Sequence, residues 1–157
     1  MNFDRIDRRI LALLQEDGRM ANADLAEAVG LSPSACLRRV RALEEAGVIE
    51  KYVALLDQSQ IGRRMDIFVE ISLNSQANEV LTRFEKAVAL SPEIMECYLM
   101  AGDADYLLRI AAADPTDFER IHRDHLARLP GVSRMKSSFA IRTVARSTAF
   151  PLPEAAH

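Results

Sequence analysis

The stretch Asn22–Leu43, NADLAEAVGLSPSACLRRVRAL, decides how the first part of the chain folds. Asn22 is placed to cap a first helix, because an asparagine oxygen accepts a free N–H group of the first turn. Gly30 is placed to end that helix in a left-handed conformation, which glycine adopts without a Cβ clash. Ser32 then caps a second helix, and Pro33 takes its first position, where a missing N–H costs nothing. The stretch therefore predicts two helices joined by a tight glycine turn.

The second of these helices has one apolar and one polar face. The apolar side chains that repeat at helical spacing and point toward a core are Cys36, Val40 and Leu43. The polar side chains at the same spacing on the opposite side are Ser34, Arg38 and Arg41, with Arg39 on the flank. This pattern is typical of the second helix of a helix-turn-helix, which enters the major groove, where arginine binds guanine or phosphate. A solvated arginine face on an ordinary helix pair is the alternative interpretation.

Composition limits the class of protein. With 157 residues, 49% hydrophobic and 27% charged, the chain suits one globular domain or two small ones. No apolar run reaches the roughly eighteen residues that a membrane helix needs, and the start of the chain shows no secretory signal. Cys36 and Cys97 form no C-x-x-C pair, so we expect free thiols in a reducing cytoplasm. The net charge of −3 means that any DNA contact comes from local basic patches.

Residues 1–50 are predicted to form a three-helix DNA-binding domain. Asp4 is placed to cap the first helix with Asp7 three residues further on, and both carboxylates suit the positive end of the helix dipole. After the third helix, Val48–Leu56 is apolar and is interpreted as a strand or a small wing. Because the residues that follow it are polar, residues 51–62 are predicted to be a connecting strand and hinge.

Residues 63–146 show a different periodicity. Met65–Leu73 alternates apolar and polar side chains, which is typical of a strand. Further strands are predicted at 94–100, 106–112 and 132–144, with a helix after the first strand and another before the last. The order β-α-β-β-α-β predicts a ferredoxin-like domain. The fold class is therefore α+β, an N-terminal winged helix-turn-helix domain plus a C-terminal ferredoxin-like domain, and residues 147–157 form a tail that is loose at its tip.

Several segments are similar to one known family. The segments that carry the resemblance are FDRIDRRIL (3–11), DGR (17–19), LAEAVGLSPSACLRRVRALEEAGVI (25–49), MAGDADYLL (100–108) and LPGV (129–132). Together they resemble the leucine-responsive regulator/AsnC family of bacterial and archaeal transcription factors over nearly the whole chain. The resemblance implies a helix-turn-helix joined to a ferredoxin-like domain that dimerises, often builds larger assemblies and commonly binds an amino acid.

The resemblance also implies two sites. The residues that match the family's DNA-facing helix are Ser32, Ser34, Arg38, Arg39 and Arg41. The residues that match its effector loop are Met100, Gly102, Asp103, Ala104 and Asp105, with Ser137 on the last strand. Met100 stands where a threonine is frequent in the family, which predicts a more apolar pocket. Gly102 lets a ligand approach the backbone closely, and the two aspartates offer charge for an ammonium group.

Other residues that could carry chemistry are few. His122 and His125 flank Asp124 and resemble a metal or acid–base cluster, but no third ligand follows at a fixed spacing. Two histidines packed at a sheet or subunit interface, where they could also sense pH, are the preferred interpretation. The sequence holds no Walker loop and no G-x-G-x-x-G, and no spacing supports a nucleophile–histidine pair. We therefore expect no catalytic site, no metal and no cofactor.

These features predict a sequence-specific DNA-binding transcriptional regulator that responds to a small amino-acid effector. We expect it in the cytoplasm, associated with the nucleoid, as a homodimer that assembles into higher oligomers such as an octamer. A two-fold dimer would bind an operator in double-stranded DNA with paired half-sites. The alternatives are a nucleoid-type architectural protein with little effector response, and a metabolite-binding protein or enzyme with a helical docking module.

Overall fold

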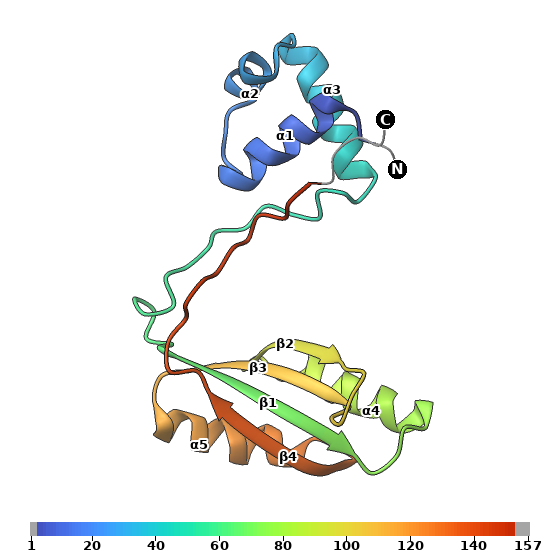
Figure 1. The fold of residues 1–157 in the computed structure, drawn as a ribbon, viewed down its shortest axis with the longest axis vertical. Helices are drawn as coiled ribbons and strands as arrows, with labels where there is room; N and C mark the ends of the chain where they lie inside the picture. The colour runs from blue at the N-terminus through green and yellow to red at the C-terminus, as the bar shows by residue number, and fades with distance from the viewer. Residues whose placement is uncertain (1–2, 153–157) are drawn as a thin grey trace. The chain divides into compact units, whose positions relative to one another are not determined.

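The computed structural model of the protein describes residues 3–152 and divides into two compact units. The first unit comprises the chain up to Leu55 together with the chain from Val144 onward, and the second comprises Leu56–Thr143. Each unit has a hydrophobic core of its own, the first built from helices and the second from a sheet and helices (Figure 1). No helix among the described residues is long and apolar enough to cross a membrane.

Three helices form the first unit. Their bounds are α1 Arg5–Glu16, α2 Asn22–Val29 and α3 Pro33–Glu45. Asp4 caps α1 as predicted: its Oδ1 accepts the N–H groups of Ile6 and Asp7, both at 2.8 Å, and the Asp7 carboxylate accepts the Asp4 N–H. The buried side chains that the helices share are Ile10, Leu11, Leu25, Ala26, Cys36 and Leu43. The capping box fixes the start of α1, and this small core packs α3 against α1 and α2.

The turn between α2 and α3 has the predicted backbone but one different contact. Gly30 ends α2 at φ +69°, and Ser32 caps α3 by accepting the Ala35 N–H at 3.3 Å. Asn22 is not a cap, because α2 begins at Asn22 and the cap position falls on Ala21, which has no side chain to serve it. The Asn22 amide instead donates to the Pro33 carbonyl at 2.8 Å and so ties the start of α2 to the start of α3.

The strand or wing expected at Val48–Leu56 is absent. The structure assigns no strand to this segment, since a strand requires the backbone of a neighbouring strand and none pairs with it. Tyr52 holds the segment instead, because its hydroxyl donates to Glu44 at 3.0 Å and its ring lies against Gly18. Burial and that hydrogen bond raise the pKa of Tyr52 to about 12.

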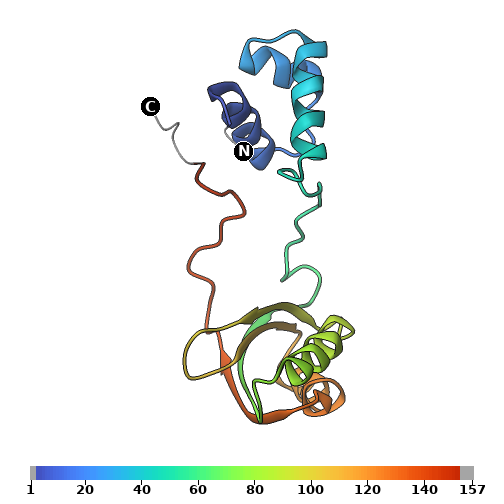
Figure 2. The same ribbon diagram turned by 90° about the vertical axis from the view of Figure 1, so that its right-hand side faces the viewer.

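The second unit is a four-stranded antiparallel sheet with two helices. Its elements are β1 Met65–Leu73, α4 Asn78–Ala89, β2 Ile94–Leu99, β3 Tyr106–Ala112, α5 Pro115–Asp124, the 3₁₀ turn η1 Leu126–Arg128 and β4 Val132–Phe139. The strand order is β2-β3-β1-β4, which is the predicted ferredoxin-like arrangement. Figure 2 shows α4 and α5 on the same side of the sheet. The other face of the sheet has no covering layer within this unit.

The strand register assigns each side chain to a face. Ile67, Val69 and Ile71 on β1 are fully buried under the helices, whereas Phe68 between them is 38% exposed on the other face. On that uncovered face the Arg109 guanidinium is only 14% exposed and binds Asp66 at 2.9 Å and Glu96 at 2.8 Å. Two residues directly opposite each other on paired strands lie on the same face of the sheet. This rule shows which side chains can belong to the site described below.

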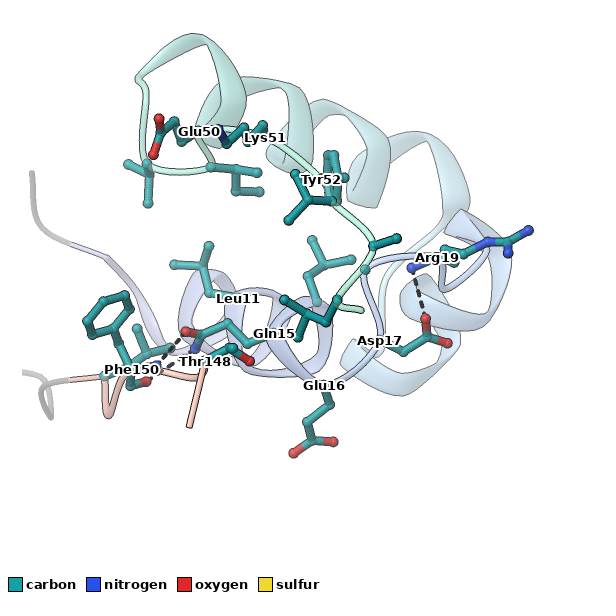
Figure 3. A pocket seen from close by; sticks show the side chains of 18 residues that line it. Leu11, Gln15, Glu16, Asp17, Arg19, Glu50, Lys51, Tyr52, Thr148 and Phe150 are labelled. Atoms are coloured by element: carbon teal, nitrogen blue, oxygen red, sulfur yellow. Dashed lines mark hydrogen bonds between the residues drawn. The ribbon is translucent and has the colours of Figure 1, made fainter. Parts of the chain in front are cut away.

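The last strand is shorter than predicted. β4 ends at Phe139, and the final backbone contact is the Ala140 N–H to the Asp66 carbonyl. From Val144 the chain belongs to the first unit. Phe150 is fastened to α1 through both backbone groups: its N–H donates to Gln15 Oε1 at 2.7 Å, and its carbonyl accepts from Gln15 Nε2 at 3.2 Å (Figure 3). The tip of the expected tail, residues 153–157, lies outside the described residues.

Candidate nucleic-acid interface and effector loop

The exposed face of α3 carries the polar residues that the sequence pattern placed there. Ser34, Arg38 and Arg41 are all exposed, on the side opposite the buried Cys36 and Leu43. Within residues 3–152, neither Arg38 nor Arg41 has an ion-pair partner, so both guanidinium groups are available to phosphates or guanine edges.

Arg39 is placed differently from its two neighbours. Its Nη1 lies 2.8 Å from Asp4 Oδ2 and 2.7 Å from Asp7 Oδ1, and its side chain is 31% exposed. The Asp7 N–H, and after it the Arg39 guanidinium, hold the pKa of Asp4 below its ordinary value. The same two carboxylates raise the pKa of Arg39. The structure therefore does not bring Arg39 together with Arg38 and Arg41, because Arg39 faces α1.

Ser32 stands at the exposed start of α3. Its hydroxyl oxygen caps the helix through the Ala35 N–H and lies 3.3 Å from the Ser34 hydroxyl. The hydroxyl of Ser32 is therefore already used by the fold, whereas that of Ser34 has no backbone partner among the described residues. Helix N-termini carry partial positive charge, which places both hydroxyls where a phosphate is favoured.

A groove of about 770 Å³ lies in the first unit beside the fastened C-terminal segment (Figure 3). α1 contributes Leu11 and Leu14 to its lining, and the segment after α3 contributes Val48, Ile49 and Tyr52. The polar groups at its rim that Figure 3 shows include the hydrogen-bonded pair of Gln15 and Phe150. The lining is mostly apolar, with the charged residues Glu16, Asp17, Arg19, Glu50 and Lys51 among it.

In the second unit, the loop between β2 and β3 contains the residues matched to the effector loop. Gly102 has φ +150°, a conformation that side chains rarely adopt. Asp105 closes the loop, since its carbonyl accepts the Met100 N–H and its N–H donates to the Ile71 carbonyl, both at 2.8 Å. The Asp105 carboxylate accepts the Leu73 N–H at 2.7 Å. Its other oxygen accepts from the Gln76 amide at 2.9 Å, so Asp105 holds the chain between β1 and α4.

Asp103 and Ala104 line a small hollow of about 240 Å³. The other residues that line it are Glu70, Arg134, Met135 and Lys136. Lys136 and Glu70 form an ion pair at 3.2 Å across β1 and β4, whereas Asp103 and Arg134 have no ion-pair partner within residues 3–152. A free carboxylate and a free guanidinium beside one hollow match the ammonium and carboxylate of an amino acid.

Four of the six predicted effector residues, Met100, Gly102, Asp105 and Ser137, do not line the hollow. Ser137 is paired with Val69, whose side chain is buried under the helices, so Ser137 shares the helix-covered face. The hollow is on the other face, where Lys136 opposes Glu70. Met100 is 43% exposed and does not line the hollow. The structure thus brings Asp103 and Ala104 into one site, assigns Asp105 to the loop's framework and separates Ser137 from both.

Sequence analysis missed Arg134 and Lys136 as candidates for this site. A usable signal existed, because Arg134 and Lys136 are two residues apart on a strand and must share a face.

The two histidines that resembled a metal or acid–base cluster lie in different surroundings. His122 is exposed, and its ring meets the Phe118 ring edge-on with the ring centres 6.2 Å apart, whereas His125 is half-buried. Among the residues that the structure describes, no group of three or more His, Cys, Asp or Glu side chains could hold a metal ion.

Two protein-family descriptions match the chain. One, described as "Winged helix-turn-helix DNA-binding", matches residues 3–50, and the other, described as "Lrp/AsnC ligand binding domain", matches residues 66–150. Together they cover both units. They confirm the predicted fold class, with a DNA-binding domain in the first part of the chain and a ligand-binding domain in the second.

Two named relatives are similar in sequence to this chain over nearly its full length. The chain is 43% identical over 150 residues to the Bkd operon transcriptional regulator of Pseudomonas aeruginosa, covering 96% of this chain and 98% of that protein. It is also 43% identical over 146 residues to the leucine-responsive regulatory protein of Escherichia coli, covering 93% and 89%.

Two solved structures are similar to this chain in both fold and sequence. An AsnC family transcriptional regulator from Agrobacterium tumefaciens has 40% identity and a TM-score of 0.90, covering 95% of this chain and 97% of that chain. A transcriptional regulator from Neisseria meningitidis, solved as a complex with L-Met, has 35% identity and a TM-score of 0.89, covering 96% and 97%. The family consists of regulators and is not enzymatic, which removes the enzyme alternative. The chain belongs to the Lrp/AsnC family of DNA-binding transcriptional regulators with an amino-acid-binding domain.

Proposed function

We propose that Ser34, Arg38 and Arg41 form the face of this regulator that binds its operator. The observation that carries the proposal is the exposure of both arginines on α3 without any acidic partner in the described chain. Arginine side chains on a helix in the major groove bind guanine or phosphate, and a base contact contributes about 1–3 kcal/mol of discrimination. Ser32 supports this face by capping the helix.

Fluorescence anisotropy with the DNA upstream of the protein's own gene tests this assignment. Arg38→Ala and Arg41→Ala should each weaken binding, and Arg83→Ala is the matched control because it removes an exposed arginine from α4 in the other unit. Unchanged affinity in both α3 variants at fixed salt would refute the assignment. Equal weakening of operator and random DNA would favour phosphate contacts over base reading.

The hollow beside Asp103 is the proposed effector site. Asp103 would bind the ammonium group of an amino acid, and Arg134 would bind its carboxylate. Support comes from the two unpaired charges at one hollow and from the neisserial neighbour, which was solved with L-Met. Calorimetry with each of the twenty amino acids tests the proposal. Asp103→Asn and Arg134→Gln should lose the binding that the unaltered protein shows, and unchanged affinity in both would refute it.

A homodimer formed through the uncovered face of the sheet is the proposed assembly unit. On this face Phe68 is 38% exposed and Tyr98 is 51% exposed, and a sheet face with apolar side chains requires a covering layer. Two helix-turn-helix units in a two-fold dimer would bind half-sites about one helical turn apart, or a multiple of it. We propose further that these dimers assemble into a higher oligomer such as an octamer, and that the protein is located in the cytoplasm on the nucleoid. Light scattering tests it, because Phe68→Glu should yield monomer where the unaltered chain does not.

A further inference from the structure

Arg39 belongs to the same helix as the proposed DNA contacts, but its surroundings differ from theirs. It approaches two carboxylates of α1 at 2.8 and 2.7 Å, distances typical of charge-assisted hydrogen bonds. Asp7 is 19% exposed and Asp4 is 50% exposed, so the contact with Asp7 lies at the junction of α1 and α3 and the contact with Asp4 lies at its rim. Asp4 and Asp7 are at the same time the capping box of α1, which fixes their positions.

The position of Arg39 on α3 explains this contact. The buried residues of the helix are Cys36 and Leu43, and Arg39 lies on the flank between this buried side and the exposed side. Arg38 and Arg41 lie on the far side, so the helix directs neighbouring guanidinium groups toward different surroundings.

We propose that Arg39 is a positioning residue, which fixes α3 against α1 through Asp4 and Asp7 and does not bind DNA. The inference deepens the proposed function, since it rests on α3 being the DNA-binding helix. If Arg39 moved to a phosphate, Asp4 and Asp7 would be left as two unpaired negative charges beside the DNA backbone, which opposes the exchange. The orientation of Arg38 and Arg41 then depends on a contact made entirely within the protein.

The salt dependence of DNA binding separates positioning from contact. Each phosphate contact adds about 0.9 to the slope of log affinity against log salt, so losing one reduces the slope by that amount. In the full-length protein, Arg39→Ala should weaken binding by about two- to tenfold and leave the slope unchanged, because α3 is less well oriented but no phosphate contact is lost. Arg41→Ala is the control and should reduce the slope if it binds phosphate. A slope reduced by about 0.9 in Arg39→Ala would overturn the proposal.

Asp7→Asn supplies a second measurement that leaves Arg39 in the chain. Under the proposal this variant weakens DNA binding by a smaller factor than Arg39→Ala, because the contact of Arg39 with Asp4 at 2.8 Å remains. The double variant should be no weaker than Arg39→Ala alone, because both changes break the same contact. If Arg39 binds DNA, Asp7→Asn releases it and binding tightens, which would overturn the proposal. If Arg38→Ala and Arg41→Ala leave affinity and slope unchanged, the proposed function fails instead.

Discussion

Replacement of Asp105 by alanine should destabilise the second unit, although the sequence marks this residue as an effector ligand. Its carboxylate accepts the Leu73 N–H at 2.7 Å and the Gln76 side-chain amide at 2.9 Å. Leu73 is only 8% exposed, so the alanine variant leaves its N–H without a partner in a poorly hydrated place. Both contacts join segments that are about thirty residues apart in the chain, and local structure cannot replace them.

The magnitude follows from these two hydrogen bonds. A hydrogen bond to a charged acceptor contributes about 1.5–3 kcal/mol, and an unsatisfied buried donor costs about 1–3 kcal/mol. The bond from Gln76 is exposed and contributes less, so we expect a total loss of about 2–4 kcal/mol. Asp105→Asn keeps an acceptor oxygen for Leu73 and should lose about half as much.

Urea unfolding of the full-length protein, monitored by circular dichroism, measures this loss. Asp103→Ala is the matched control, because its carboxylate is exposed and has no hydrogen-bond or ion-pair partner among residues 3–152; we expect a change within about 0.5 kcal/mol. A loss below about 0.5 kcal/mol in Asp105→Ala would refute the structural role of the carboxylate. Unchanged stability combined with lost amino-acid binding would return Asp105 to the effector site.

Three further changes test other parts of the structure. Gly131→Ala should cost about 1–3 kcal/mol in urea unfolding, because φ is +76° and the new Cβ would lie 2.9 Å from Val80 Cγ1; Gly62→Ala, with φ +77° and open space around it, isolates the backbone part. Asp4→Asn should flatten the loss of stability in acid, since the lowered pKa of Asp4 gives stability above its ordinary pKa that disappears as pH falls through the folded value; an identical acid profile would contradict this. Gln15→Ala should speed trypsin cleavage after Arg146, because the backbone of Phe150 loses both hydrogen bonds, and an unchanged rate would show that the segment is held by other contacts.

The order of elements could be predicted because the signals are local. Alternating side chains mark β1, and β3 has the predicted bounds Tyr106–Ala112. Asp114 caps α5, since its Oδ1 accepts the Asp117 N–H at 2.8 Å. Each of these features depends on residues within a few positions of one another, which sequence patterns describe well.

The site could be predicted only in part because its contacts are distant in sequence. Arg39 meets Asp4 and Asp7 from 35 and 32 positions away, so the pattern of α3 alone cannot distinguish it from Arg38. Ser137 is opposite Val69, so the pairing of β4 with β1 places it on the helix-covered face, away from the hollow. A strand's face is fixed by its partners, and a single sequence does not name those partners.

The net charge of −3 is compatible with DNA binding because the protein pairs its acids selectively. Asp4 and Asp7, two carboxylates on the α1 side of α3, share the one positive charge of Arg39, while Arg38 and Arg41 have no acidic partner in the described chain. Salt screens charges beyond about 8 Å at physiological ionic strength, so DNA at this face responds mainly to the two free arginines. The remaining acids still oppose association over the rest of the surface. The negative charge around this local basic face therefore lowers the affinity for non-specific DNA more than the affinity for the operator. This difference favours binding to an operator among many competing sites.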